Sequence, residues 1–253
     1  QYRQLILKNK GPIMGKKELK KTMRSSLGYA YFGWNHDSKF FGDKRVRQAM
    51  TLALNRTGMI DKIFLGLGKL TTGPFAHQNP CYDKSVKPYP FDLKQAGKKL
   101  DEAGWKDTDG DGIRDKVIDG VKTAFEFRML VWQSKTWKSV TSDVFREDLL
   151  SIGVKLRIEQ LEWSMMLKRM DERDFDGYTG AWALSWHTDF MQIWHSREAD
   201  KSKSSNRIGF RNKEADRIAE TLRKTFDNAE RTKLCHQFHA LVHEEQPYTF
   251  IMQ

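Results

Sequence analysis

Residues 125–158 contain a strand, a helix and a second strand, and this pattern constrains the fold more than any other stretch of the chain. Apolar side chains alternate over 125–131, recur on one helix face over 140–149, and alternate again over 154–158. Two strands joined by one helix of this length form a parallel pair with a right-handed crossover. The sequence therefore predicts the α/β class. The apolar positions of this unit are Phe125, Phe127, Met129, Val131, Val140, Val144, Phe145, Leu149, Val154, Leu156 and Ile158.

Capping residues mark other helices. An Asp or Asn, whose side-chain oxygen can accept backbone N–H groups, precedes an apolar face at helical spacing at Asp43, Asp92, Asn212 and Asp227. Gly58 is expected to break the first run, and Gly104 to end the second. Strands are predicted over 29–34, 178–184 and 248–252, a helix over 163–170, and a loop over 66–90. The third capped face is predicted to contain Ala215, Ile218, Ala219, Leu222 and Phe226.

The chain is basic, with 44 Lys and Arg against 33 Asp and Glu. Apart from one cluster over 16–24, these charges are spread among acids, without a basic stripe of interleaved aromatic residues. We therefore predict no nucleic-acid partner. No apolar run of about 18 residues is present to span a membrane. The chain starts at Gln1 without a charged-then-apolar leader, so a signal peptide is expected to be absent or already removed.

The two cysteines, Cys81 and Cys235, fit no metal-ligand spacing. A disulfide between them is permitted in an oxidising compartment, but the sequence does not imply one. Their pairing therefore stays open at this point.

Several motifs, in order along the chain, resemble one protein family. They are Asn35 to Ile63 (NHDSKFFGDKRVRQAMTLALNRTGMIDKI), Trp182-Ala183-Leu184 followed by Asp189 and residues 192–196, the turn over 206–212, and the stretches 226–231 and 245–250. Together they resemble the extracellular solute-binding proteins of family 5, the peptide-, oligopeptide- and nickel-binding receptors of ABC importers.

The resemblance implies an α/β fold with a mixed sheet and flanking helices, namely the second lobe of a periplasmic-binding-protein-like, two-lobed receptor (type II, cluster C). Residues 1–30 would end the first lobe and form the hinge, 31–245 would form the second lobe, and 246–253 would return towards the first lobe. Family members run to about twice this length, as two-domain chains do, so the N-terminal lobe is expected to be missing.

The same resemblance implies a non-catalytic, monomeric receptor in the periplasm or at the cell surface, with no required cofactor. It would bind peptides or peptide-like solutes between two lobes and deliver them to an ABC permease. In peptide-binding relatives, an Asp three residues after the motif's Trp pairs with the ligand's α-amino group. The matching residue here is Ser185, which carries no charge, and the nearby Asp189 is expected to take over the role.

The predicted ligand contacts gather after the third predicted strand. Indole faces offer rigid contact area, and a carboxylate suits an amine or a guanidinium. The alternative is that the tryptophans are core residues and the Asp is a turn residue. Two asparagines at strand-to-turn junctions are further candidates, although turns alone explain them. The predicted set is Trp182, Ser185, Trp186, Asp189, Asn35 and Asn206.

Residues 107–115 carry an acidic motif that resembles a calcium-binding loop. Asp107, Asp109, Asp111 and Asp115 occupy positions 1, 3, 5 and 9 of a calcium loop, with glycine at 6 and the Ile113 carbonyl at 7. Isoleucine replaces the bidentate Glu expected at position 12, which removes much of the affinity. The motif predicts a weak structural calcium site, with an acidic turn as the alternative.

Two other functions stay open. One is a metal-dependent hydrolase using His187, Asp189 and His195, which metal content and hydrolysis assays would reveal. The other is a basic module that docks an acidic partner, which salt dependence of association would reveal. Neither accounts for the ordered motifs.

Overall fold

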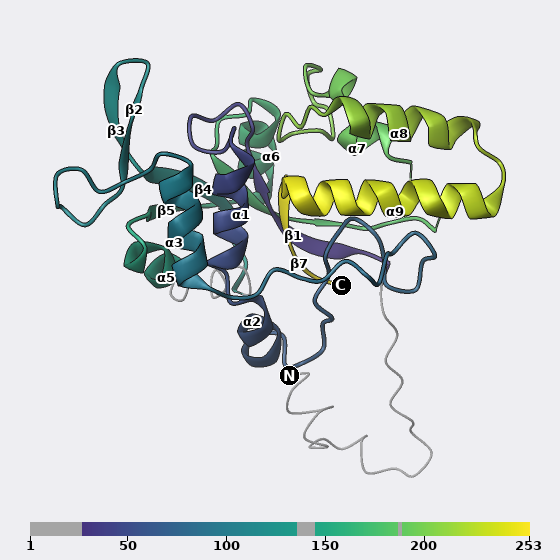
Figure 1. Cartoon of the computed structure of the whole chain (residues 1–253), viewed down its shortest axis with the longest axis horizontal. Coiled ribbons are helices and arrows are strands. Elements are labelled where there is room, and N and C mark those ends of the chain that lie inside the picture. The colour runs from purple at the N-terminus through teal and green to yellow at the C-terminus, as the bar shows by residue number, and fades with distance from the viewer. Residues whose placement is uncertain (1–26, 136–144, 187–188) are drawn as a thin grey trace, which may run out of the picture.

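The computed structural model describes residues 27–135, 145–186 and 189–253. Within these residues, five strands form one sheet in the order β5-β4-β6-β1-β7, between two layers of helices (Figure 1). β4 (Glu126–Trp132) is parallel to β5 (Lys155–Leu161) and to β6 (Gly177–Trp182), whereas β1 (Tyr29–Trp34) is antiparallel to β6 and to β7 (Tyr248–Met252). The sheet is therefore mixed, and the predicted parallel pair is confirmed.

One face of the sheet packs against α1 (Lys44–Leu52), α3 (Leu93–Glu102) and α5 (Phe145–Ser151). α1 begins where the Asp43 carboxylate accepts the Arg45 N–H at 2.8 Å, and α3 where Asp92 accepts the Gln95 N–H at 2.8 Å. Both predicted N-caps are thus confirmed. Val140 and Val144, predicted to extend the helix before Phe145, lie outside the described residues, as does the basic cluster over 16–24.

The opposite face packs against α6 (Trp163–Asp171), α7 (Met191–Trp194), α8 (Lys213–Lys224) and α9 (Asn228–Glu245). α8 and α9 begin after the predicted caps Asn212 and Asp227. Each cap accepts two backbone N–H groups of the first turn. A short 3-10 helix, η3 (Ser196–Glu198), leads out of α7.

Three sequence expectations are wrong in detail. Gly58 does not break a helix: α2 (Arg56–Lys62) begins after Asn55, whose Oδ1 accepts the Gly58 N–H at 2.9 Å, so this glycine lies in the first turn. Phe226 does not join the buried face of α8, because that helix ends at Lys224 and the Phe226 side chain is 90% exposed. The strand predicted over 178–184 is shorter at its end, since β6 stops at Trp182.

A hairpin follows the acidic loop and projects from the body of the protein (Figure 1). β2 (Asp115–Ile118) and β3 (Val121–Ala124) are joined by Asp119 and Gly120, which have φ of 49° and 78°. Positive φ at both central residues is the requirement of a type I′ turn, and Asp-Gly is a sequence that supplies it.

The loop over 66–90 is anchored to α9. A disulfide joins Cys81 in the loop to Cys235 in the helix, which answers the question that the sequence left open. The buried His239 accepts the Asp83 N–H on Nδ1 at 3.0 Å, while its Nε2 lies 2.9 Å from the Thr72 hydroxyl oxygen. Burial lowers the pKa of His239 to about 4, so this imidazole is neutral at pH 7. Among the described residues, no helix has the length and apolar character needed to cross a membrane.

Candidate functional site

A cavity of about 570 Å³ opens where β4 and β6 separate. Three tryptophans line it: Trp132 is the last residue of β4, Trp182 the last residue of β6, and Trp163 the first residue of α6, which follows β5. Because β4, β5 and β6 are parallel, their carboxyl ends meet at one edge of the sheet, where open α/β sheets bind ligands. We call this space the tryptophan cavity.

Two of the tryptophans present bare indole surface. Trp132 and Trp163 are 45% and 48% exposed, and their rings meet edge to face with centroids 6.1 Å apart. Large apolar side chains left in contact with solvent side by side mark an interaction surface more often than isolated ones do. This wall is therefore suited to an apolar or aromatic ligand group.

The backbone beside the cavity is also available. β4 pairs with β6 only at Gly177 and Tyr178, whereas β1 pairs with β6 as far as Trp182. In the described part of the chain, the edge of β6 that faces β4 thus has no strand partner over residues 179–182. Unpaired strand edges carry N–H and C=O groups that an incoming extended chain can use.

Buried tyrosines form the floor of the cavity. The hydroxyl groups of Tyr31 and Tyr178 are 3.0 Å apart, and the Tyr31 ring stacks on Tyr248 with centroids 3.9 Å apart. Burial raises the pKa of Tyr31 and of Tyr178 well above the usual value, so both phenols stay neutral. The Trp182 indole N–H donates to the Tyr248 hydroxyl at 3.4 Å, which links the wall to this floor.

Besides the aromatic side chains, two polar side chains line the tryptophan cavity. The Thr179 hydroxyl is buried and has no hydrogen-bond partner within the described structure. Arg207 is the only charged residue among those described that line the cavity, and its Nε donates to the Asp171 carboxylate at 3.3 Å. The cavity therefore combines apolar walls with one positive charge and one unused hydroxyl.

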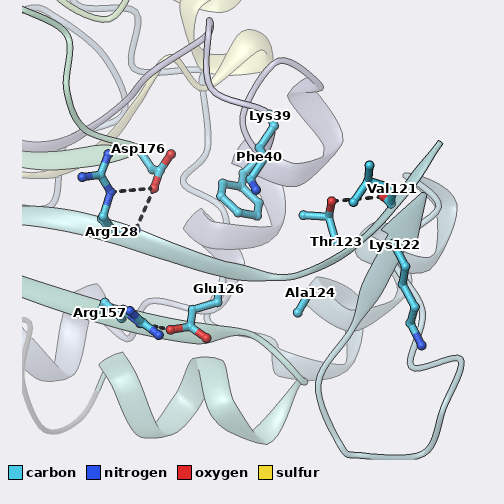
Figure 2. Close-up of a pocket in the computed structure, with 10 residues that line it drawn as sticks. All are labelled: Lys39, Phe40, Val121, Lys122, Thr123, Ala124, Glu126, Arg128, Arg157 and Asp176. Carbon is cyan, nitrogen blue, oxygen red and sulfur yellow. Dashed lines mark hydrogen bonds and ion pairs between the residues drawn. The ribbon is translucent and has the colours of Figure 1, made fainter. Parts of the chain in front are cut away.

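A second cavity, of about 580 Å³, lies beside the hairpin of β2 and β3 (Figure 2). Both of its carboxylates are paired within the cavity: Arg157 forms an ion pair with Glu126, and Arg128 Nε lies 3.8 Å from the Asp176 carboxylate, which also accepts the Arg128 backbone N–H at 2.8 Å. Figure 2 shows the Lys122 side chain directed away from these pairs. The two cavities are similar in size, so their lining residues decide between them. The second cavity has no tryptophan wall and both of its carboxylates are already paired, so it is the weaker candidate.

Comparison with known proteins places the chain in a family. Residues 5–204 match the model of the bacterial extracellular solute-binding proteins, family 5 Middle. The chain belongs to this family. It is a family of solute-binding proteins and not of enzymes.

Relatives and solved structures agree with this assignment. The chain is 34% identical to the oligopeptide-binding protein AppA of Bacillus subtilis, over 89% of its own length and 41% of AppA. The structure of AppA in complex with a nonapeptide superposes with a TM-score of 0.84 at 33% identity, over 93% of this chain and 46% of that one. The oligopeptide-binding protein of Thermus thermophilus, complexed with a pentapeptide, gives 0.79 at 27% identity, over 89% and 41%. The family 5 chain thus spans less than half of each relative, and its α/β lobe matches part of these structures.

The residues predicted as ligand contacts do not all meet. Trp182 lines the tryptophan cavity, whereas the 47% exposed Trp186 lines a separate cavity of about 370 Å³ beside the disulfide. Ser185 is exposed between them. The Asp189 carboxylate forms an ion pair with Arg223 and accepts the Met191 N–H at 3.0 Å. A ligand amine at Asp189 would have to displace Arg223.

The two asparagines brace turns. The Asn35 amide donates to the Phe175 carbonyl at 2.8 Å, and its oxygen accepts the Asp37 N–H. Asn206, which is fully buried, donates to the Phe210 carbonyl at 2.8 Å and accepts the Phe210 N–H at 2.9 Å. Neither lines the tryptophan cavity, but Asn206 holds the turn that carries Arg207.

The predicted metal residues are only partly brought together. Among the described residues, the one group of acidic, His or Cys side chains close enough to share an ion is Asp107, Asp109 and Asp115, whose ligand atoms lie within 4.8 Å of one another. Asp111 is outside this group, while a ligand role for the Ile113 backbone carbonyl stays a prediction. Lys122 Nζ forms an ion pair with the Asp109 carboxylate at 2.6 Å, so an ammonium group already neutralises part of the negative charge of the cluster.

The hydrolase alternative finds no support in this geometry. His195 Nε2 bonds to Glu220 at 3.1 Å, and its Nδ1 accepts the Arg197 N–H, whereas Asp189 is paired elsewhere. His187 lies outside the described residues.

Sequence reasoning missed most of the tryptophan cavity. Trp132, Trp163, Thr179 and Arg207 were not among the predicted contacts, although one rule points to the tryptophans. Trp132 is the last residue of β4, and Trp163 comes two residues after the end of β5. The sequence pattern predicts these two strands as a parallel pair, and ligands bind at the carboxyl ends of parallel strands. Arg207 carries no such mark, because its place depends on the turn that Asn206 braces.

Proposed function

We propose that this chain binds peptides or peptide-like solutes in an extended conformation along the free edge of β6. One observation carries the proposal: over residues 179–182, the unpaired edge of β6 runs beside the tryptophan cavity. An extended peptide can add to a sheet edge through main-chain hydrogen bonds, which are indifferent to sequence. Alternate side chains then point to one face, so one of them enters the cavity. The AppA and Thermus relatives, solved with a nonapeptide and a pentapeptide, support this choice of ligand class.

Family membership supports the wider role. We propose that the protein is the substrate-binding component of an ABC importer, exported to the periplasm or the cell surface, monomeric, and a partner of a membrane permease. Its mechanism would be closure of two lobes around the ligand, which stabilises the closed state by contacting both. Since this chain would supply one of the two surfaces, we expect it to bind peptides more weakly than about 1 μM by itself. Sub-micromolar binding by this chain would contradict the one-lobe proposal.

The remaining predicted contacts belong to a longer ligand path. Trp186 and Asp189, with Ser185, would be reached by a ligand that extends past Trp182 towards the disulfide-bonded loop. Such a ligand would place its amine at Asp189 in competition with Arg223.

Truncating the indoles at the cavity mouth tests the proposal. Trp163→Ala and Trp132→Ala should each weaken peptide binding about 10- to 100-fold, because each removes a wall of rigid aromatic contact worth about 1–3 kcal/mol at a binding hot spot. Isothermal titration calorimetry with a mixed set of pentapeptides measures the change. Phe226→Ala, which truncates an aromatic side chain that is 90% exposed and outside the cavity, serves as control and should bind like the wild type. Equal binding by all four proteins would rule the cavity out.

We further propose that the acidic loop over 107–115 binds calcium weakly, in competition with Lys122. The carboxylates of Asp107, Asp109 and Asp115 already converge, as calcium ligands must. Lys122 Nζ lies 2.6 Å from Asp109 and 3.4 Å from Asp115, so it holds the position that a cation would take.

Two substitutions separate this proposal from a plain acidic turn. Lys122→Met should raise the calcium affinity seen by calorimetry, because the competing charge is gone, and Asp109→Ala should abolish calcium heat and any calcium-dependent rise in melting temperature. If neither the wild type nor Lys122→Met produces heat with millimolar calcium, the loop is only a turn.

A further inference from the structure

We propose that Arg207 selects ligands that place a carboxylate in the tryptophan cavity, next to an apolar or aromatic group. The inference rests on the proposed peptide-binding function and names the chemical class of ligand that this site prefers.

The guanidinium of Arg207 is only partly used by the protein. Its Nε donates to Asp171 at 3.3 Å, while the described structure gives neither terminal amino group a hydrogen-bond partner. Those two groups form the planar fork that matches the two oxygens of a carboxylate. Because the Arg207 side chain is only 21% exposed, solvent screens its charge less than that of a surface arginine.

Arg207 is also held in place. The Asp171 carboxylate fixes one side of the guanidinium, and Asn206 closes the turn beneath it through both amide groups. Arg173 donates to the Asn206 carbonyl at 3.3 Å and ties this turn to the end of α6. A charge that is oriented before the ligand arrives loses little side-chain entropy on binding.

A second observation points to the same ligand group. The Thr179 hydroxyl is 3% exposed, lines the cavity and has no partner in the described structure. Buried hydroxyls are normally hydrogen-bonded, so a ligand oxygen is the partner that this one lacks. The other lining side chains are aromatic or aliphatic, and none of them is a carboxylate, so a cationic ligand group would be repelled by Arg207 without an acidic lining residue to compensate.

Matched peptides test the charge. The pentapeptide Ala-Ala-Phe-Ala-Ala is compared with its C-terminal amide, and amidated Ala-Ala-Phe-Glu-Ala with amidated Ala-Ala-Phe-Gln-Ala, by calorimetry on the full chain. We expect one carboxylate, terminal or side-chain, to strengthen binding to the wild type about 10- to 100-fold, the range for a hydrogen bond to a charged group. The pair that shows the difference identifies the source of the carboxylate.

Variants assign the preference to Arg207. Arg207→Gln should lose it, and Arg207→Lys should keep only part of it, because an ammonium lacks the fork. Arg169→Gln is the control: Arg169 has the same 21% exposure on α6, but pairs with Glu159 and Asp174 outside the cavity, so the preference should survive. This inference is overturned, and the proposed function is not, if peptides bind equally with and without the carboxylate. The same holds if the carboxylate preference persists in Arg207→Gln. If no peptide binds at all, the proposed function fails with it.

Discussion

Replacing Trp34 with alanine is expected to lower the free energy of unfolding by about 4–5 kcal/mol, the upper range for truncating a large buried aromatic residue. Trp34 is fully buried at the end of β1, and its ring packs against Phe41 and Phe127 with centroids 4.7 and 6.0 Å away. Its indole N–H donates to the Thr249 hydroxyl at 3.0 Å, so the substitution also removes a cross-strand hydrogen bond. Urea denaturation followed by circular dichroism measures the loss.

Two comparison variants make this result interpretable. Trp34→Phe keeps a ring in the core and should cost about half as much, since only part of the volume and the hydrogen bond are removed. Phe226→Ala removes an aromatic side chain that is 90% exposed and should leave the unfolding midpoint where it is. A loss below about 2 kcal/mol in Trp34→Ala would show that this side of the sheet is not the packed core.

Removing the disulfide is expected to cost about 2–5 kcal/mol, as for other native disulfides. Cys81 and Cys235 are separated by 154 residues, so the bond closes a long loop in the unfolded chain and lowers the conformational entropy of that state. The Cys81→Ser, Cys235→Ser double variant should therefore melt at a lower temperature than the wild type under oxidising conditions. The same drop should follow when reductant is added to the wild type.

Reductant added to the double variant is the control, because no disulfide is left to break, and its midpoint should stay constant. Loss of the bond should also loosen the loop that carries Asn79, whose amide donates to the Trp186 carbonyl at 2.7 Å. An unchanged midpoint for the wild type in reductant would mean that this disulfide does not stabilise the fold.

Local patterns predicted most of the secondary structure. The caps at Asp43, Asp92, Asn212 and Asp227 are correct because a cap depends on a side chain and backbone N–H groups no more than three residues away. Gly58 shows the limit of such patterns. Asn55, three residues before it, caps a new helix, and this signal outweighs the low helix propensity of one glycine.

The candidate site was predictable only in part. Trp182 was found because it belongs to a motif and lies in a predicted strand. Trp186 and Asp189 were grouped with it on side-chain chemistry and on their nearness to the same motif, which do not say which cavity a side chain reaches. β6 ends at Trp182, and after that residue the chain turns towards the disulfide loop and Arg223, so near neighbours in sequence reach different cavities.

The sequence by itself determined the α/β class, the parallel pair of β4 and β5, the caps of four helices and membership of family 5, since each follows from residues a few positions apart or from motifs in order. Only the tertiary structure decided which residues meet. The sheet order β5-β4-β6-β1-β7 brings Trp132, Trp163 and Trp182 together, and a braced turn adds Arg207. The physical reason is that these contacts join residues about 20 to 75 positions apart in the chain, whose approach is set by packing of the whole sheet and not by local conformational preference.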